Sequence, residues 1–386
     1  MIQNFFHGGR RYWTLMALWV VLIVIGLFAY DRQWHLGLSV TGMSRDVSWG
    51  LYIAQFTFMV GVAASAVMVV LPFYLHDYKA FAKTVILGEF LAVSSVIVCM
   101  TFVFVDLGQP RRVMNVLLHP QFHSVMFWDF MSLFGYLLLN IVIGSMAIEA
   151  ERKGTPPPHW VHPLIYLSIP WAVSIHTVTG FLYAGLASRP FWMSAILAPR
   201  FLASAFAAGP SLLIVLALGV RRWGGFDVGR QAIRTLGTIV TYAMAVNVFF
   251  VLLELFTALY SGIPHDRQTL TYLYVGLSGR DALTPWMWAG DILAVVSLVG
   301  LLVPRIRHQE RWLVPLCAGV FTSLWIDKGL ALVVAGFIPS PLEAVTQYAP
   351  TLTEITISVG VYAVGALVLT MLYKLVLNVR EKTQLA

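Results

Sequence analysis

Ten apolar stretches divide this chain from end to end, and they constrain its fold more than any other feature. A helix that crosses a bilayer needs about 20 apolar residues, and only helices or closed barrels satisfy their backbone polar groups inside it. The sequence is 59% hydrophobic and 11% charged, as is typical of a polytopic membrane protein. We therefore expect an all-α integral membrane fold. The expected spans lie at roughly 12–30, 50–75, 84–105, 125–148, 160–186, 199–219, 236–260, 284–303, 312–336 and 352–377.

The connections between these stretches are too short for a soluble domain, so residues 1–386 are predicted to form a single membrane domain. The first stretch follows Arg10 and Arg11 and superficially resembles a signal peptide. Its exit at 28–31 (FAYD) has no small-x-small cleavage pattern. We interpret the stretch as an uncleaved first helix at 12–30.

Runs of small residues lie in the second and sixth stretches, at 61–66 and 203–209. Such faces let neighbouring membrane helices pack closely. We interpret each run as the first helix of a four-helix bundle, with the first and tenth helices outside the two bundles. The predicted divisions are 49–187, 195–337 and 352–377 for the first bundle, the second bundle and the tenth helix.

Lysine and arginine are unevenly distributed over the loops. The side that would hold both termini carries twice as many of them as the other side. The positive-inside rule therefore predicts cytoplasmic N- and C-termini. This bias accounts for the net charge of +7, and a nucleic-acid partner is not expected. The loops on the opposite side are longer and rich in aromatic, Pro and Gly residues, so they either dock a partner or only cover helix ends.

The chain is short of ligands for redox metals. Its only cysteines are Cys99 and Cys317, whereas an iron–sulfur cluster needs about four thiolates. Of ten histidines only His176 lies well inside a predicted helix, which disfavours a bis-histidine haem. We expect no haem, no iron–sulfur cluster and no metal site in this chain.

Seven ionisable side chains fall inside the hydrophobic stretches and, by the predicted topology, share the outer half of the membrane. Each costs several kcal/mol in hydrocarbon, by order of magnitude, unless it has a partner, a water-filled cavity or a function. Together they predict a layer of chemistry near the outer face. They are Asp129, His176, Glu254, Asp291, Asp327, Lys328 and Glu354.

The first predicted bundle offers the parts of a quinone site. His176 shares a helical face with Thr179, Gly180 and Tyr183, because these residues are three, four and seven positions apart. A histidine can hydrogen-bond a quinone carbonyl, and a carboxylate can set its tautomer or relay a proton. The proposed catalytic residues are His176, Asp106 and Asp129, and the proposed pocket walls are Trp49, Tyr52, Trp128 and Tyr183. The alternative is a histidine satisfied by a neighbouring helix, with the aromatic residues forming an interfacial belt.

The second bundle and the tenth helix offer a proton relay. An outward polar stripe with side chains or waters at each step can carry protons. The alternative is an ion-pair cluster that only holds helices together, for instance Lys328 with Asp327 or Glu354. The candidate relay residues are Glu254, Asp291, Asp327, Lys328 and Glu354, with Glu89 toward the cytoplasm.

Several short motifs are distributed over nearly the whole chain. They are 48–53 (SWGLYI), 61–66 (GVAASA), 106–111 (DLGQPR), 174–179 (SIHTVT), 189–192 (RPFW), 195–201 (AILAPRF), 254–257 (ELFT), 325–329 (WIDKG), 337–339 (FIP) and 350–354 (PTLTE). Together they resemble the NrfD/PsrC family of polysulfide-reductase membrane subunits. The overall pattern resembles the ten-helix branch represented by HybB and DsrP, and 124–129 (SVMFWD) is more similar to the DsrP type.

The resemblance implies a haem-free subunit of the prokaryotic inner membrane that binds menaquinone or ubiquinone near the outer face. It also implies a periplasmic ferredoxin-like partner with [4Fe–4S] clusters, and further subunits such as cytochrome c or haem b proteins. His176 matches the family's histidine at the quinone pocket, with Asp106 and Trp49 in neighbouring motifs. Such a chain has no complete active site alone, and coupling to proton translocation stays open.

Two other classes of function are compatible with the same residues. A secondary transporter or ion channel also places ionisable groups in the membrane, although its site is expected near the bilayer midplane. A purely structural anchor would tolerate neutralisation of the acidic residues.

Overall fold

The computed structural model describes residues 9–385, so residues 1–8 and 386 of the predicted membrane domain lie outside the described part. Within that part all regular secondary structure is helical, apart from one isolated bridge between Leu277 and Arg280. Ten of these helices are long and apolar enough to cross a membrane. The predicted fold class and number of candidate spans are therefore confirmed.

The candidate spans follow one another along the chain, and two of them are built from more than one helical segment. They are α1 (Arg10–Leu36), α2 (Leu51–Ala64) with α3 (Val67–Leu75), α4 (Ala82–Asp106), α6 (Val125–Lys153), α7 (Val161–Ala184), α8 (Leu197–Gly224), α9 (Arg230–Ser261), α11 (Thr284–Leu302), α13 (Glu310–Leu324) with η6 (Trp325–Ala331) and α14 (Leu332–Ala335), and α15 (Leu352–Leu385).

Short helices lie in the connections. They are η2 (Gly37–Val40), η3 (Lys79–Phe81), η4 (Pro110–Arg112), α5 (Asn115–Leu118), η5 (Pro190–Trp192), α10 (Pro264–Tyr274) and α12 (Pro304–Arg307). The first helix is longer than the sequence predicts, because α1 continues through Asp31 and Arg32 to Leu36. One of its last residues, Gln33, is buried and donates a hydrogen bond to the Val105 carbonyl of α4.

Helix α2 is the centre of the molecule. All of its residues are buried, and it packs against α4, α7, α8, α15 and η6. It has no polar face to turn outward, since its most polar side chains, Gln55 and Thr57, are also buried. A helix that is apolar all round and surrounded by others in this way belongs to the interior of a large bundle.

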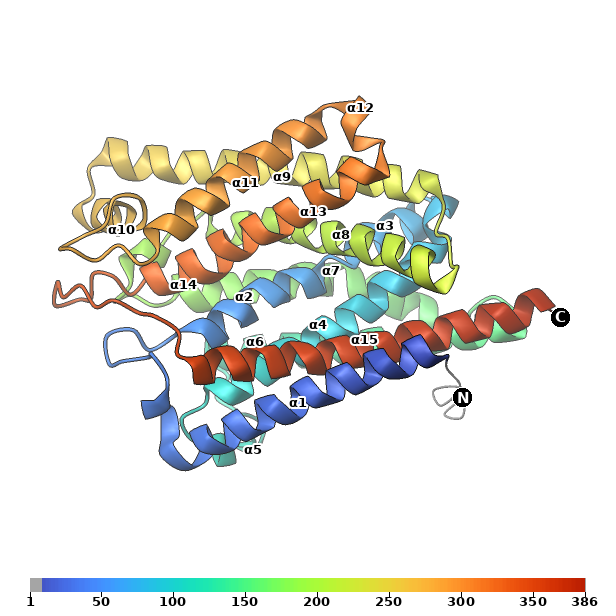
Figure 1. The fold of residues 1–386 in the computed structure, drawn as a ribbon, viewed down its shortest axis with the longest axis horizontal. Helices are drawn as coiled ribbons and strands as arrows, with labels where there is room; N and C mark the ends of the chain where they lie inside the picture. Colours follow the sequence, from blue (N-terminus) through green and yellow to red (C-terminus); the bar gives the residue numbers. More distant parts are fainter. Residues whose placement is uncertain (1–8, 386) are drawn as a thin grey trace.

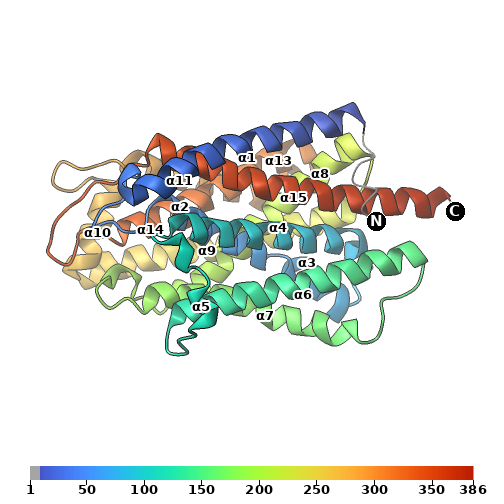
Figure 2. The ribbon, with the colours of Figure 1, turned by 90° about the horizontal axis from the view of Figure 1, so that it is seen from below.

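Helices α1 and α15 lie side by side along one flank (Figures 1 and 2). They cross where Gly26 faces Gly360, and a Cβ added at Gly26 would lie only 2.7 Å from the Gly360 Cα. The rest of α1 is largely exposed, as expected for a helix that faces lipid. The two glycines therefore set how closely the first and last helices approach.

The remaining spans surround α2 on two sides. On one side α4 packs against α6, α6 against α7, and α7 against α2. On the other side α8, α9, α11 and α13 pack against one another in a ring. The two sides meet where α2 and α7 contact α8.

Both described ends of the chain lie at one end of the bundle, and the loops with α10 and η5 lie at the opposite end (Figure 1). This arrangement follows from an even number of spans. The end with α10 holds the longer loops, and most of the ionisable side chains discussed below lie in the half of the bundle next to it.

Candidate functional site

His176 and Lys328 meet in the centre of the bundle. The Lys328 Nζ lies 2.7 Å from the His176 Nε2, and the two residues are 3% and 0% exposed. His176 lies on α7 with Thr179, Gly180 and Tyr183, all of which are buried, as their spacing predicts. Gly61 of α2 lies against the pair, and a Cβ there would be 3.2 Å from the Lys328 Nζ. The pair therefore rests directly on the α2 backbone.

The contacts of Lys328 determine where the imidazole carries its proton. With Lys328 as the donor, the His176 Nε2 accepts this hydrogen bond and the imidazole proton is on Nδ1. The ammonium also lies 4.3 Å from the centre of the Phe201 ring. The His176 Nδ1 is buried and has no hydrogen-bond partner among the described residues. An unpaired buried donor costs about 1–3 kcal/mol, so this N–H is a candidate ligand contact.

Aromatic side chains close the space between His176 and the end of the bundle with α10. Tyr183 contacts Phe201, Trp192 and Trp49, and Trp49 stacks on Trp192 with the ring centres 5.7 Å apart. Trp192 is held by a hydrogen bond from its indole to the Leu332 carbonyl. The structure thus brings the predicted wall residues Trp49 and Tyr183 together beside His176.

The carboxylate of Asp129 is buried on the same side. It accepts a 2.6 Å hydrogen bond from Thr179, which lies one turn from His176 on α7. Its neighbour Trp128 points elsewhere, since it is 50% exposed and donates to the Phe122 carbonyl. Of these two predicted site residues, only Asp129 is hydrogen-bonded to the face of α7 that holds His176, through Thr179.

Tyr52 and Asp106 belong to a separate polar group near α1. The Tyr52 hydroxyl donates to Gln33, whose amide donates in turn to the Val105 carbonyl. Asp106 follows Val105, and its Oδ1 is buried without a hydrogen-bond partner among the described residues. This carboxylate is therefore available to a proton or a ligand.

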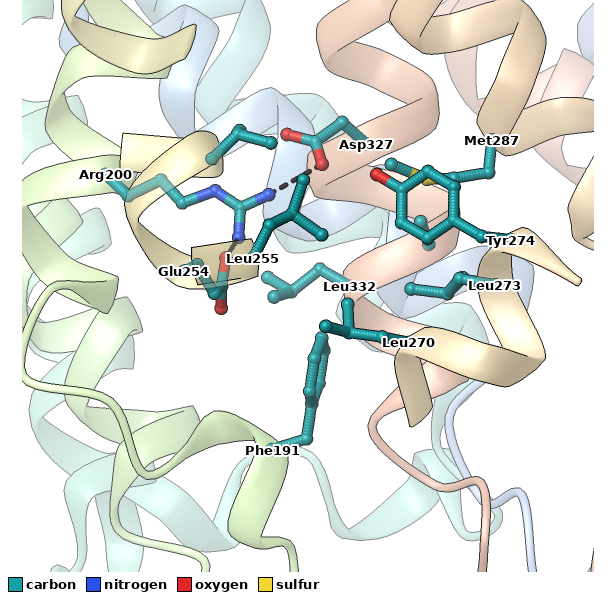
Figure 3. Close-up of a pocket in the computed structure, with 12 residues that line it drawn as sticks. Phe191, Arg200, Glu254, Leu255, Leu270, Leu273, Tyr274, Met287, Asp327 and Leu332 are labelled. Atoms are coloured by element: carbon teal, nitrogen blue, oxygen red, sulfur yellow. Dashed lines mark hydrogen bonds and ion pairs between the residues drawn. The ribbon is translucent and has the colours of Figure 1, made fainter. Parts of the chain in front are cut away.

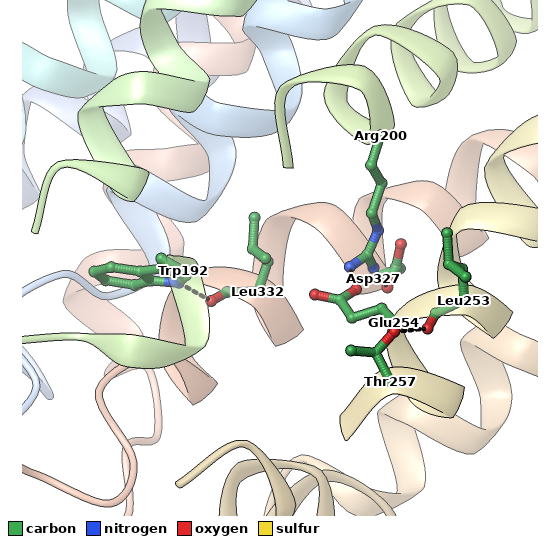
Figure 4. A network of polar contacts seen from close by, with 7 residues as sticks. All are labelled: Trp192, Arg200, Leu253, Glu254, Thr257, Asp327 and Leu332. Carbon is green, nitrogen blue, oxygen red and sulfur yellow. Dashed lines mark hydrogen bonds and ion pairs between the residues drawn. The ribbon is translucent and has the colours of Figure 1, made fainter. Parts of the chain in front are cut away.

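Arg200 is the centre of a second buried network. Its guanidinium lies between two carboxylates, with an ion pair to Glu254 of α9 and another of 2.6 Å to Asp327 of η6 (Figures 3 and 4). The Arg200 side chain is 9% exposed. Arg200 lies in the first turn of α8, which begins at Leu197, close to the predicted start of this span at 199.

The two networks meet at consecutive residues of η6, which is a π-helical segment. Asp327 contacts Arg200 of α8, whereas Lys328 contacts His176 of α7. The predicted example of a pair between Lys328 and Asp327 or Glu354 is therefore not found among the described ion pairs. A π-helical turn inside an α-helix is rare and is often found at functional sites.

A small cavity of about 20 Å³ lies next to the Arg200 network (Figure 3). This is room for about one water molecule. Tyr274 of α10 lines the cavity, and burial, together with the nearby Asp291 and Asp327, raises the pKa of its hydroxyl. The predicted relay residue Asp291 therefore lies next to the network through Tyr274.

The sequence pattern of the family described as polysulphide reductase, NrfD, matches residues 39–340, more than three quarters of the chain. This chain belongs to the NrfD family. The match includes the His176–Lys328 pair and the Arg200 network, but it ends before α15 and begins after α1.

Relatives of this NrfD chain cover nearly its whole length. It is 28% identical to a putative dimethyl sulfoxide reductase membrane subunit of Halobacterium salinarum, over 95% of this chain and 91% of the relative. It is 22% identical to an Hdr-like menaquinol oxidoreductase integral membrane subunit of Archaeoglobus fulgidus, over 96% and 95%. It is also 22% identical to a menaquinone reductase integral membrane subunit of Nitratidesulfovibrio vulgaris, over 94% and 91%.

Glu354 of this NrfD chain lies apart from the Arg200 network. It is buried at the start of α15, where its carboxylate accepts hydrogen bonds from the Tyr348 hydroxyl and from the backbone N–H groups of Gly42 and Thr351. Tyr348 also accepts a hydrogen bond from the Leu51 N–H of α2. Through these hydrogen bonds Glu354 links two loops to α2 and α15. None of the described hydrogen bonds or ion pairs joins it to another residue of the predicted relay.

Tyr348→Phe is expected to lower the stability of the folded protein by about 1–3 kcal/mol, since it leaves a buried N–H and a carboxylate oxygen unpaired. Burial, followed by the Glu354 carboxylate, raises the pKa of Tyr348, so the hydroxyl remains a donor at neutral pH. Thermal unfolding of the purified protein measures the loss. Tyr260→Phe is the control, because Tyr260 is 81% exposed; equal unfolding temperatures for the two variants would refute the role of Tyr348.

Glu89, the predicted inner end of the relay, is buried in α4 at 2% exposure. Its Oε2 has no hydrogen-bond partner among the described residues. Among the side chains that the structure describes, no group of three or more His, Cys, Asp or Glu residues could hold a metal ion. Cys99 and Cys317 are both buried and unbridged.

Sequence reasoning missed three residues that organise the interior: Arg200, Gln33 and Gln55. For Arg200 a signal was present, because Glu254 and Asp327 together needed a cation and Lys328 alone could not neutralise both. Gln33 and Gln55 are single amides in apolar stretches, and no charge pattern distinguishes them.

Proposed function

We propose that this chain is the quinone-interacting membrane subunit of a respiratory oxidoreductase complex. The observation that carries the proposal is the buried His176 N–H at Nδ1, which Lys328 fixes in position and which lacks a partner among the described residues. Membership in the NrfD family and the menaquinol- and menaquinone-linked names of two relatives support the same function.

The residues present suit a quinone head group. A bound menaquinone or ubiquinone supplies two-electron, two-proton chemistry. His176 would donate from Nδ1 to a carbonyl oxygen, and the Lys328 ammonium would stabilise negative charge that develops there. Asp129, which is buried and held by Thr179, and Asp106, whose Oδ1 is unpaired among the described residues, are the carboxylates that we propose for proton exchange.

Because no redox metal site is expected in this chain, electrons would pass to or from another subunit. We propose a periplasmic ferredoxin-like [4Fe–4S] partner on the loops at the α10 end, with both termini in the cytoplasm. The uneven distribution of lysine and arginine supports this orientation. The packing of α2–α7 and of α8–α13 supports two four-helix bundles. The assignment to the DsrP type remains a prediction that rests on 124–129 alone.

The Arg200 network and its water-sized cavity would provide the proton path, with Glu254, Asp327 and Asp291 as its carboxylates. The buried Arg200 network with its cavity also favours the alternative function, a proton-linked transporter. Proton uptake into vesicles by the isolated subunit, without any redox partner, would favour the transporter.

His176→Ala is expected to reduce quinone-linked electron transfer at least 100-fold while the complex still assembles, because it removes the N–H that would donate to the quinone carbonyl. The measurement is the rate of electron transfer between the partner's clusters and a soluble menaquinone or menaquinol analogue in the purified complex. His162→Ala, near the other end of α7, is the control. Unchanged turnover in His176→Ala would contradict the assignment of His176 to the quinone site.

A further inference from the structure

A large apolar cavity lies on the side of α2 that faces away from His176. Its volume is about 550 Å³, within the usual range for small-ligand pockets. It lies between α2, α11, the α13–η6 segment and α15. Six lining residues carry the argument: Gln55, Trp286, Trp325, Tyr348, Ser358 and Tyr362.

The cavity and the His176–Lys328 pair are on different sides of α2. Gln55 lines the cavity, whereas Gly61 lies against the pair. Six residues at about 100° each place these two positions about 120° apart around the helix axis. His176 and Tyr183 themselves have no exposed surface. The cavity at Gln55 is therefore distinct from the region around His176.

The hydrogen bonds of Gln55 fix which way its amide points. The Trp325 indole N–H donates to the Gln55 Oε1 at 2.6 Å, and the Tyr362 hydroxyl also donates to it. An indole nitrogen only donates, so the oxygen of the amide has to be the atom at this position. Among the described residues no hydrogen bond is found for the Gln55 NH2 group, although the residue is 2% exposed.

A second unpaired polar group lines the same cavity. The hydroxyl of Ser358 on α15 is buried and has no hydrogen-bond partner among the described residues, and the residue is 6% exposed. Leaving the buried Ser358 hydroxyl unpaired costs about 1–3 kcal/mol. An apolar cavity with two unpaired donors is therefore best satisfied by a ligand that carries acceptors.

The walls of the cavity favour a flat ring. Trp286 and Trp325 meet edge to face with their ring centres 6.4 Å apart, and Tyr362 lines the cavity beside Trp325. Aromatic walls of this kind pack well against a planar ring. A lipid acyl chain would fill the volume, but it would leave both donors unpaired.

We propose that this cavity is a second quinone-binding site, in which the Gln55 NH2 group and the Ser358 hydroxyl donate to the quinone carbonyls between Trp286, Trp325 and Tyr362. The inference rests on the proposed function, since the same class of ligand is involved. The site requires α15, which lies outside the segment that matches the NrfD pattern.

Photolabelling of the purified complex with an azido-naphthoquinone tests the proposal. Adducts are expected on residues that line the cavity, at Trp286, Trp325 or α15. Gln55→Leu should reduce these adducts at least tenfold, because an amide donor is replaced by an apolar group of similar size. Ser358→Leu, which fills the cavity without touching Gln55, should do the same. His176→Ala should leave them unchanged.

Gln231→Leu controls for the substitution, since Gln231 is exposed near the start of α9 at the other end of the bundle. The second site would be contradicted if the adducts were confined to α7. It would also be contradicted if the cavity adducts persisted in both Gln55→Leu and Ser358→Leu. Neither result would contradict the proposed function. Labelling that excess unlabelled quinone does not compete away would also overturn it, in favour of a lipid. Unchanged electron transfer in His176→Ala would instead reject the proposed function.

Discussion

Arg200→Met should destabilise the folded protein by about 3–5 kcal/mol, because it removes the cation that lies between two buried carboxylates. Glu254 and Asp327 would then face each other in the membrane interior with no guanidinium to satisfy them. The expected result is a fall in the thermal unfolding temperature of the purified protein, accompanied by a lower yield of folded complex.

Two further variants separate charge from packing at this position. Arg200→Lys keeps the charge but cannot hold both carboxylates with one planar group, so its loss should be intermediate. Combining Arg200→Met with Glu254→Gln and Asp327→Asn removes all the charges and should recover part of the stability.

Arg152→Met is the matched control for Arg200→Met, since Arg152 pairs with Glu149 while 54% exposed. A surface pair of this kind contributes about 0–1 kcal/mol. If Arg152→Met and Arg200→Met unfold at the same temperature, the buried network does not hold α8, α9 and η6 together.

Lys328→Met should reduce quinone-linked electron transfer about 100- to 1,000-fold, which is the usual loss when one fixed electrostatic contact is removed from a reacting centre. The substitution removes the ammonium next to His176 and also the contact that keeps the imidazole proton on Nδ1. The measurement is the turnover of the purified complex with a soluble menaquinol analogue, together with the unfolding temperature.

Lys328→Arg tests whether positive charge alone is enough. The space is narrow, since Gly61 and the Phe201 ring both lie against the Lys328 side chain, so the larger guanidinium should restore only part of the rate. Lys83→Met, at an exposed position of α4, controls for loss of a lysine. Turnover near the wild-type value in Lys328→Met would contradict a role for the His176–Lys328 pair.

The number of spans could be predicted from the sequence because it depends only on runs of apolar residues. The buried face of α7 could also be predicted, since the helical repeat of 3.6 residues places His176, Thr179 and Tyr183 on one side. Both predictions depend on information within a single helix.

The partners of the buried charges depend on contacts between helices, and there the sequence was insufficient. Arg200 falls inside the predicted span 199–219, but its position near the start of a helix does not reveal that it pairs with Glu254 and Asp327 on two other segments. In η6 the π-helical turn directs Asp327 and Lys328 to different helices, and a regular helical repeat does not reveal this. Glu354, like Glu254, is a glutamate in an apolar stretch. Its carboxylate, however, accepts hydrogen bonds from the backbone of two loops and does not pair with an arginine.

The close crossing of α1 and α15 has a consequence for biosynthesis. Helix α1 is made before α15, although α15 is the helix on which it mainly packs. At about 5–20 residues per second, the ribosome adds the intervening chain in roughly 20–70 seconds. During that interval α1 is in the bilayer without its main partner, so release of a nascent chain before α15 leaves the Gly26 surface bare. Until α15 docks, α1 therefore lacks the neighbour against which Gly26 packs.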